Sequence, residues 1–145
     1  CFRSDGSAVL IDFGLAQLEP MSDKATFVGT PAYAPPEMWL RRRWSRSNDM
    51  WSLGVTLFCC LAGEHPFQSD DGHLSQFNLC NSIYDGLPTD TSDAARDFLR
   101  RLLCTNPYRR MSASQALQHH FLQNNMSKPR RLAALRLSRI CGSTH

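Results

Sequence analysis

The aspartate at position 12 is the residue whose type and place in the sequence bear most directly on chemistry. It follows an apolar run rich in β-branched side chains, residues 8–11, which predicts a buried strand. Its carboxylate therefore stands at the carboxyl end of that strand, and Gly14 lets the chain change direction two residues later. An aspartate that merely caps a turn fits the same local pattern, so Asp12 has two interpretations at this point.

Histidine and cysteine side chains give no clear metal site in the sequence. His119 and His120 are adjacent, but no cysteine or carboxylate accompanies them at metal-ligand spacing, so we expect both on the surface at a helix end. The six cysteines contain no CxxC pair, and Cys59 and Cys60 fall in an apolar stretch where they would fill core space. This usage indicates a reduced, intracellular compartment, cytoplasmic or nuclear.

The basic residues are unevenly distributed. Residues 1–127 hold 11 of the 16 lysines and arginines and all 13 acidic residues, a formal charge of −2, so the net charge of +3 comes from the tail. This distribution argues against a nucleic-acid-binding body. The cluster of residues 41–43 and Arg46 is either a solvated loop or a docking patch for acidic partners. We expect neither a signal peptide nor a membrane span.

The element that would organise the others covers residues 48–63. After Asp49 it has no charge until Glu64, and apolar side chains lie on every face of the helix that it would form. A helix of this kind is buried in a core or in a membrane, and its uncharged stretch of roughly 13 residues is shorter than the ~20 that span a bilayer. We therefore predict a buried central helix with Asn48 or Asp49 as N-cap and Gly63 at its end.

Before and after this helix the sequence is less regular. Residues 15–36 lack periodicity, include three prolines near their end and predict a long loop. A short helix is expected over residues 37–40, and a second over residues 74–84 that ends at Gly86.

Two further helices have clear start signals. Ser92 caps an amphipathic helix that we expect to end at Pro107, and Ser112 forms a capping box with Gln115 for a last helix through Phe121. The side chains predicted to face inward are Ala95, Phe98, Leu99, Leu102 and Leu103 on the first helix, and Ala113, Ala116, Leu117 and Phe121 on the second. The chain is thus predicted to be mainly helical.

Six segments, in this order, resemble the C-terminal lobe of a eukaryotic protein kinase. They are Asp12-Phe13-Gly14, residues 29–37 ending in Pro-Pro-Glu in place of Ala-Pro-Glu, residues 49–55, residues 63–67, residues 92–110 and residues 119–122. The resemblance covers about residues 8–122 and is closest to calcium/calmodulin-dependent and checkpoint-type serine/threonine kinases. It implies a short β-hairpin remnant and a helix bundle around a buried central helix, as part of an α+β kinase fold. Residues 1–125 would be a partial kinase domain and residues 126–145 a basic tail.

The resemblance also assigns roles to residues near the start of the chain. Asp12 matches the aspartate that holds the Mg²⁺ bridging the ATP phosphates, and Phe13 and Gly14 would complete this cofactor-binding motif, with Phe13 packed inward. Thr30 matches a hydroxyl close to the catalytic aspartate, and the Gly-Thr-Pro triplet around it favours a serine/threonine acceptor. Thr26 stands at the spacing of an activation-loop phosphosite, where phosphate would add a charge of about −2; a solvated loop threonine is the alternative.

Three residues would serve the structure of such a lobe. Glu37 and Arg110 would form a buried ion pair that ties the end of the activation segment to the loop before the last helix. Asp49 would accept backbone hydrogen bonds from the catalytic loop. Residues 128–140, which are basic and contain Leu132, Leu135, Leu137 and Ile140, indicate a calmodulin-binding or autoinhibitory helix, with a disordered basic tail as the alternative.

Other parts of a complete kinase are not recognised in this sequence. The glycine-rich loop, the ATP-anchoring lysine, its helix glutamate and the catalytic-loop aspartate and asparagine have no match, and only 11 residues precede Asp12. We therefore expect a fragment, inactive alone, of a kinase that transfers the ATP γ-phosphate to serine or threonine of a protein substrate with the help of Mg²⁺. The alternative is a non-catalytic, pseudokinase-like interaction module.

Overall fold

The computed structural model describes residues 1–16, 29–41, 44–68, 73–81 and 85–125. Its helices are, in chain order, η1 (Pro31–Tyr33), α1 (Pro36–Arg41), α2 (Arg46–Ala62), α3 (Gln76–Asn81), α4 (Asp93–Leu102), α5 (Ala113–Gln118) and α6 (His120–Asn125). In this part of the chain β pairing is limited to two isolated antiparallel bridges, Phe2 with Ala8 and Gln68 with Leu74. The predicted mainly helical class is confirmed. No described helix combines the length and the apolar character needed to cross a bilayer.

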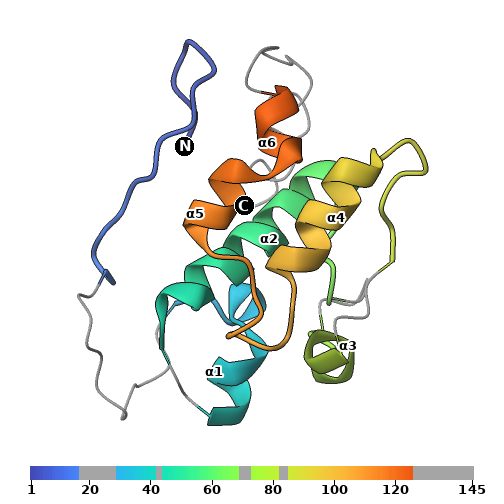
Figure 1. Ribbon diagram of the computed structural model, residues 1–145. Coiled ribbons are helices and arrows are strands. Elements are labelled where there is room, and N and C mark those ends of the chain that lie inside the picture. The colour runs from blue at the N-terminus through green and yellow to red at the C-terminus, as the bar shows by residue number, and fades with distance from the viewer. Residues whose placement is uncertain (17–28, 42–43, 69–72, 82–84, 126–145) are drawn as a thin grey trace.

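Helix α2 is the longest element and lies at the centre of the helices (Figure 1). It begins earlier than predicted, because Ser45 is the N-cap and its N–H donates to Asn48 Oδ1 at 2.9 Å. The predicted N-cap at Asn48 or Asp49 was therefore wrong: Asn48 satisfies the start of the helix from its first turn. The predicted end is confirmed, since Gly63 has φ 83°, the left-handed conformation that glycine adopts without steric cost.

The central helix is buried on one side only. Its buried apolar residues are Met50, Trp51, Gly54, Val55, Phe58 and Cys59. Leu53, by contrast, is 46% exposed, and Asp49 and Thr56 are exposed as well. A helix buried all round was thus predicted wrongly: in the described part of the chain, one face of α2 has no cover.

Helix α4 packs beside α2 and closes the core (Figure 1). Ser92 caps it as predicted, with its Oγ accepting a hydrogen bond from the Ala95 N–H at 3.3 Å. The inward-facing residues predicted for this helix are all buried. The helix ends at Leu102, before Pro107, so the proline does not terminate it.

The approach of α2 to α4 depends on one glycine. A Cβ atom added at Gly54 would lie 2.9 Å from Leu102 Cβ and 2.9 Å from Leu103 Cδ2. Non-bonded carbon atoms in proteins do not approach this closely. The two helices can therefore pack at this distance only because residue 54 has no side chain.

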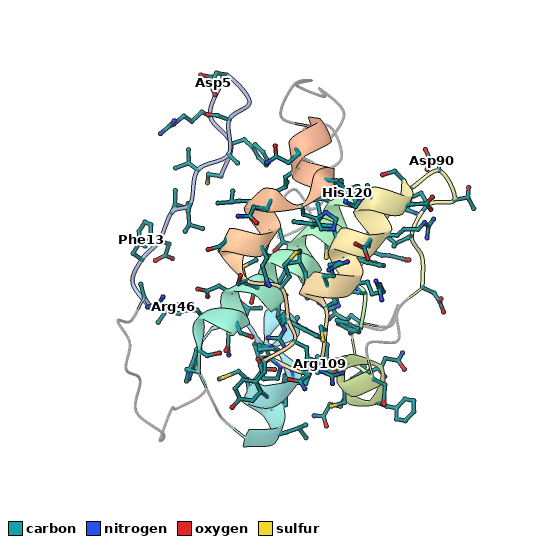
Figure 2. All side chains as sticks on the ribbon, in the orientation of Figure 1. Asp5, Phe13, Arg46, Asp90, Arg109 and His120 are labelled. Atoms are coloured by element: carbon teal, nitrogen blue, oxygen red, sulfur yellow. The ribbon has the colours of Figure 1, made fainter. Side chains whose placement is uncertain are left out.

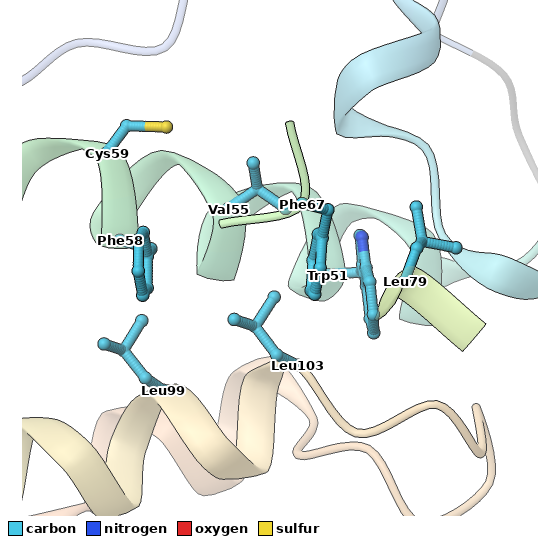
Figure 3. Close-up of a cluster of buried hydrophobic side chains, with 8 residues drawn as sticks. All are labelled: Trp51, Val55, Phe58, Cys59, Phe67, Leu79, Leu99 and Leu103. Carbon is cyan, nitrogen blue, oxygen red and sulfur yellow. The ribbon is translucent and has the colours of Figure 1, made fainter. Parts of the chain in front are cut away.

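The main core cluster lies between α2, α4 and the segments that follow α2 (Figure 3). Its members are Trp51, Val55, Phe58, Cys59, Phe67, Leu79, Leu99 and Leu103. The rings of Trp51 and Phe67 stack with centroids 5.4 Å apart. Each large apolar side chain buried in this way stabilises the fold by about 1.5–3 kcal/mol relative to exposure, which makes this cluster the part of the fold that fixes α2.

The last predicted helix is two helices. The capping box is present, with the Ser112 N–H donating to Gln115 Oε1 at 2.9 Å. Helix α5 stops at Gln118, because His119 adopts an extended conformation before α6 begins. The chain bends there, so Leu117, predicted to face inward, is 66% exposed; Ala113 is exposed too, while Ala116 is buried as predicted.

The first segment, residues 1–16, runs along one side of the helices (Figure 1). Its bridge pairs Phe2 with Ala8, but Leu10 is 81% exposed and Ile11 is exposed. The predicted buried strand over residues 8–11 was therefore wrong, because a single pair of strands with no third strand and no packed face is marginal in water. Helix α3 is shorter than predicted, and residues 82–84 lie outside the described part of the chain.

Candidate functional site

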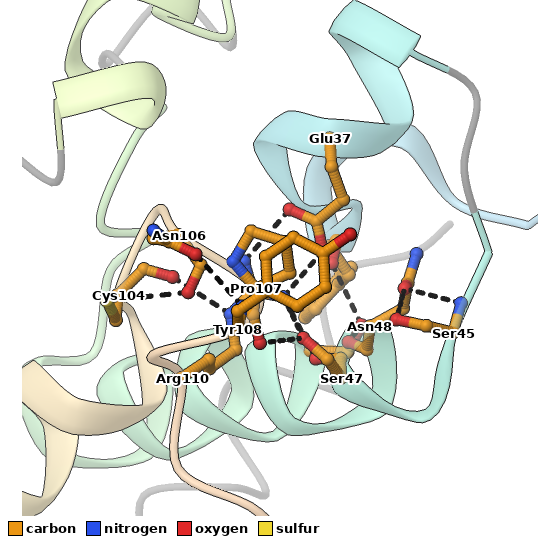
Figure 4. Close-up of polar contacts among 11 residues, drawn as sticks. Glu37, Ser45, Ser47, Asn48, Cys104, Asn106, Pro107, Tyr108 and Arg110 are labelled. Atoms are coloured by element: carbon orange, nitrogen blue, oxygen red, sulfur yellow. Dashed lines mark hydrogen bonds and ion pairs between the residues drawn. The ribbon is translucent and has the colours of Figure 1, made fainter.

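A buried ion pair joins α1 to the loop between α4 and α5 (Figure 4). Arg110 Nη1 lies 2.7 Å from Glu37 Oε1, and its Nη2 lies 2.9 Å from Glu37 Oε2. Both side chains are buried. Two parallel N–H···O bonds between a planar guanidinium and a carboxylate are the strongest and most directional form of this pairing. The pair predicted between these residues is present.

Arg110 makes three further hydrogen bonds, to Cys104 and Ser47. Its Nε donates to the Cys104 carbonyl at 2.9 Å, and Nη1 donates to the Ser47 carbonyl at 2.9 Å and to Ser47 Oγ at 3.0 Å. The guanidinium carbon lies 5.0 Å from the Trp51 ring centroid. Arg110 therefore fastens α1, the start of α2 and the α4–α5 loop to one another.

Residues 29–37, the Thr30 segment, form the stretch that this ion pair holds at its end. Gly29 has φ 101°, a conformation that favours glycine, and the exposed Thr30 precedes η1. The Tyr33 N–H donates to the Thr30 carbonyl at 3.1 Å, which closes the turn. Thr30 is therefore presented to solvent on a defined turn.

Two side chains outside the Thr30 segment bind its backbone. Ser52 Oγ, on α2, donates to the Tyr33 carbonyl at 2.9 Å. His65 Nε2, in the turn after α2, lies 3.0 Å from the Ala32 carbonyl oxygen. Together with the Glu37 ion pair, these bonds fix the segment against the buried core.

Asp12 has an unusual backbone conformation, with φ 62°. It is the one non-glycine residue with positive φ among those described, and aspartate tolerates this region better than most residues. Its Oδ1 accepts a hydrogen bond from the Gly14 N–H at 3.2 Å. Backbone strain of this kind concentrates at functional sites, which is consistent with a site role for this residue.

The structure does not bring Asp12 together with the Thr30 segment. In residues 1–16, the backbone and side-chain hydrogen bonds described here stay within the segment. Figure 2 shows the Phe13 side chain out in this segment, and it is 66% exposed. Inward packing of Phe13 was therefore predicted wrongly for this chain: the described helices offer it no pocket.

Asp12 fits a magnesium site as a single ligand. Its side chain is exposed, and a carboxylate oxygen is the kind of ligand that Mg²⁺ prefers. Across the described ranges, however, no three His, Cys, Asp or Glu residues gather as a metal site. Mg²⁺ usually takes one or two carboxylates and keeps water or phosphate oxygens for the rest, so one carboxylate is compatible with it but holds it weakly.

The structure does not test the roles predicted for Asp49, Thr26 and residues 128–140. The Asp49 side chain is exposed on the uncovered face of α2, so its role toward a catalytic loop stays a prediction. Thr26 and residues 128–140 lie outside the described residues.

A second polar cluster links α4 to the junction of α5 and α6. Asp97 Oδ2 lies 3.0 Å from His119 Nε2 and 2.8 Å from Arg101 Nε, while Oδ1 accepts from Arg100 Nη2 at 2.7 Å. The hydrogen bonds from Arg100, His119 and Arg101 hold the pKa of the Asp97 carboxyl well below its ordinary value. His119 is buried, so its predicted place on the surface was wrong; His120 is exposed as expected.

Sequence reasoning missed the positioning role of Ser52, His65 and Ser47. Each binds a partner far away in the chain: Ser52 reaches Tyr33 and His65 reaches Ala32. No periodicity or spacing signals such contacts. The one sequence feature that could have indicated these roles is the presence of polar residues within an otherwise apolar helix, or directly after it.

Comparison with known proteins agrees with this geometry. A family model described as "Protein kinase domain" matches residues 2–122. Serine/threonine-protein kinase H1 of Homo sapiens is 37% identical over 122 residues, which cover 80% of this chain and 29% of that protein. Calcium/calmodulin-dependent protein kinase type 1 of Macrobrachium nipponense is 31% identical over 128 residues, 83% of this chain and 36% of that protein. Aurora kinase of Schizosaccharomyces pombe is 35% identical over 118 residues, 81% and 33% respectively. The chain thus spans about a third of the length of these relatives.

Proposed function

Because the chain belongs to the protein kinase domain family, we propose that it forms the acceptor side of a serine/threonine protein kinase. In this proposal residues 1–125 are part of the C-terminal lobe, with residues 1–9 as a remnant of its β-hairpin, and residues 126–145 are a tail. The complete protein transfers the γ-phosphate of ATP to a serine or threonine hydroxyl of a protein substrate. The bidentate bond between Arg110 and Glu37, which anchors the Thr30 segment to the core, carries this proposal.

Asp12 and Thr30 have the direct roles. Asp12 offers its exposed carboxylate to Mg²⁺, which, when bound, neutralises charge on the ATP phosphates. Thr30, which is exposed, would place its hydroxyl near the catalytic aspartate of the complete kinase and help to shape the acceptor site. Phosphoryl transfer depends mainly on positioning and on neutralising charge, so a rigid Thr30 segment contributes by fixing the acceptor. Phosphorylation at Thr26, in the same stretch of chain, is the modification that we expect to regulate it.

The chain alone is not expected to transfer phosphate. Asp12 stands in a segment that has no described hydrogen bond to the helices, and no second metal ligand accompanies it in the described ranges. A single exposed carboxylate gives Mg²⁺·ATP too little binding free energy for turnover.

The test compares two proteins in a radiolabelled-ATP assay with a mixed serine, threonine and tyrosine peptide library. One is the chain of residues 1–145, and the other carries the reading frame extended upstream through an ATP-binding lobe. We expect no incorporation by the first, and serine/threonine incorporation by the second that is lost in its Asp12→Ala variant. Asp5→Ala is the matched control, because Asp5 is exposed in the same segment and accepts a hydrogen bond from the nearby Ser7 N–H.

Two outcomes would overturn the proposal. Label incorporated by residues 1–145, and lost on Asp12→Ala, would show that the chain is sufficient. An extended protein that folds but transfers no phosphate, or transfers it equally well without Asp12, would favour the non-catalytic interaction module.

The basic tail is a separate part of the proposal. Residues 128–140 carry five basic side chains interleaved with leucines, a composition typical of calmodulin-binding segments. Among the similar proteins are kinases named as calcium/calmodulin-dependent. Titration of a peptide of residues 126–145 with Ca²⁺-calmodulin tests it, and absence of binding at micromolar concentration would remove this partner.

A further inference from the structure

Both ring nitrogens of His65 are used, and their partners fix the tautomer. The Phe67 N–H, which can only donate, lies 3.1 Å from Nδ1. The Ala32 carbonyl, which can only accept, lies 3.0 Å from Nε2. The proton of the neutral ring is therefore on Nε2, and a second proton on Nδ1 would remove the acceptor for Phe67.

The ring lies in half-buried, largely uncharged surroundings. Tyr33 of η1 meets it edge-on with centroids 5.8 Å apart, and Phe67 of its own turn meets it at 6.2 Å. Glu64, the neighbouring carboxylate, is exposed and lies against Gly86. Burial lowers the pKa of His65, and the bond to Ala32 opposes that shift. These surroundings favour the neutral ring.

The bond from His65 has no full substitute. Ser52 Oγ also holds the Thr30 segment, through the Tyr33 carbonyl at 2.9 Å, but the same oxygen lies 3.2 Å from the Asn48 carbonyl. A hydroxyl has one proton to donate, so Ser52 divides it between these two acceptors. His65 supplies an undivided bond to the η1 part of the segment, whereas Arg110 holds its end at Glu37.

We propose that His65 is a positioning residue that holds the Thr30 segment against the core only while its ring is neutral. The inference rests on the proposed function, because the Thr30 segment is there the acceptor platform. The unfolded or released ring takes up a proton more readily than the docked ring, because the docked ring is half-buried and its Nδ1 must accept from the Phe67 N–H. The docked arrangement of the turn, and with it the contact to Ala32, therefore weakens as pH falls below about 6.5, the ordinary pKa of histidine. Acidification would then loosen the η1 part of the acceptor platform, while its end at Glu37, α4 and the core stay in place.

The experiment is amide hydrogen exchange by NMR on residues 1–145, with protection factors compared at about pH 7.5 and about pH 5. The reporters are the Tyr33 and Ala34 amides, which donate to Thr30 and Pro31, and the Leu103 amide is the internal reference. In the wild type we expect protection of the two reporters to fall about fivefold relative to the reference at the lower pH, the factor that one lost hydrogen bond gives.

Variants separate the protonation from the shape of the side chain. His65→Gln keeps an amide donor for Ala32 and does not titrate, so its reporters should show no pH-dependent loss. His65→Phe keeps an aromatic ring without either bond, so protection should be low at both pH values. His120→Gln removes an exposed histidine elsewhere and should behave like the wild type.

Several results would overturn the proposal. These are equal protection at both pH values in the wild type, the same pH-dependent loss in His65→Gln, or imidazole ¹⁵N shifts that place the proton on Nδ1. If His65→Phe fails to fold, His65→Gln and the ¹⁵N shifts still decide. No ATP or substrate is involved, so failure of phosphoryl transfer and failure of this inference are separate results.

Discussion

Arg110 and Glu37 meet through two hydrogen bonds of 2.7 and 2.9 Å inside the fold, where both side chains are buried. A charge buried in this way is tolerated because its partner is present. The relationship explains how a short helix near the start of the chain and a loop near its end share one anchoring point.

Removing either partner should destabilise the fold strongly. Glu37→Ala leaves the Arg110 guanidinium buried without its carboxylate, and we expect a loss of about 3–5 kcal/mol in the free energy of unfolding. Urea denaturation followed by circular dichroism measures it. Arg109→Ala is the matched control, because Arg109 is exposed beside Arg110 and should change stability by less than about 0.5 kcal/mol. A loss below about 1 kcal/mol for Glu37→Ala would contradict a role for the pair in stability.

Gly54→Ala should loosen the packing of α2 on α4. The added methyl group would lie 2.9 Å from both Leu102 Cβ and Leu103 Cδ2, so the helices must separate. Overpacking of this kind costs about 1–3 kcal/mol, partly offset by the better helix propensity of alanine. Thermal unfolding measures the change. Leu53→Ala, on the exposed face of the same helix, should cost less, and an unchanged or higher Tm for Gly54→Ala would rule out the steric role.

The Asp97 cluster should make stability depend on acid pH. Arg100, His119 and Arg101 lower the pKa of Asp97 below its ordinary 3.8, so the folded protein binds this proton more weakly than the unfolded chain. The contribution of Asp97 is therefore complete above that value and is lost as pH falls below it. Urea midpoints at about pH 5 and about pH 3 should differ less in Asp97→Asn than in the wild type. Asp90→Asn changes a carboxylate that is exposed in a loop, so it should keep the wild-type difference. The same difference between the two midpoints in all three proteins would refute the role of Asp97 in acid stability.

Cys59 should resist thiol reagents while the protein is folded. Burial, with a smaller contribution from Cys60, raises the pKa of its thiol to about 11, so little thiolate exists near neutral pH. Brief maleimide treatment at about pH 8, followed by peptide mass spectrometry, should label the exposed Cys1 and spare Cys59. In urea both should react. Labelling of Cys59 at the rate of Cys1 in the folded protein would contradict its burial.

Capping residues and the spacing of apolar side chains predicted those helices that are determined by residues close together in the sequence. Ser92 and the apolar spacing after it identified α4, and Ser112 with Gln115 identified the start of α5. The same signals failed where a contact between residues far apart in the sequence determines where a helix ends. The break at His119 accompanies its bond to Asp97 on another helix, and no pattern around residue 119 encodes that bond.

The candidate site divides in a similar way. The pairing of Glu37 with Arg110 followed from family resemblance, because two charges far apart in the sequence carry no mutual signal. Phe13 and the apolar run before it contain the residues of a buried element, but burial also needs a covering surface, which the described helices do not supply. The bond from His65 to Ala32 was beyond prediction, since it depends on how a turn folds back onto η1.

The separation of 73 positions in the sequence between Glu37 and Arg110 has a consequence for synthesis of the protein. Glu37 is translated before its guanidinium partner, so its carboxylate must stay hydrated until Arg110 is available. The Thr30 segment cannot be locked in place until the codon for Arg110 has been read. A nascent chain that stops earlier contains the acceptor segment without its anchor.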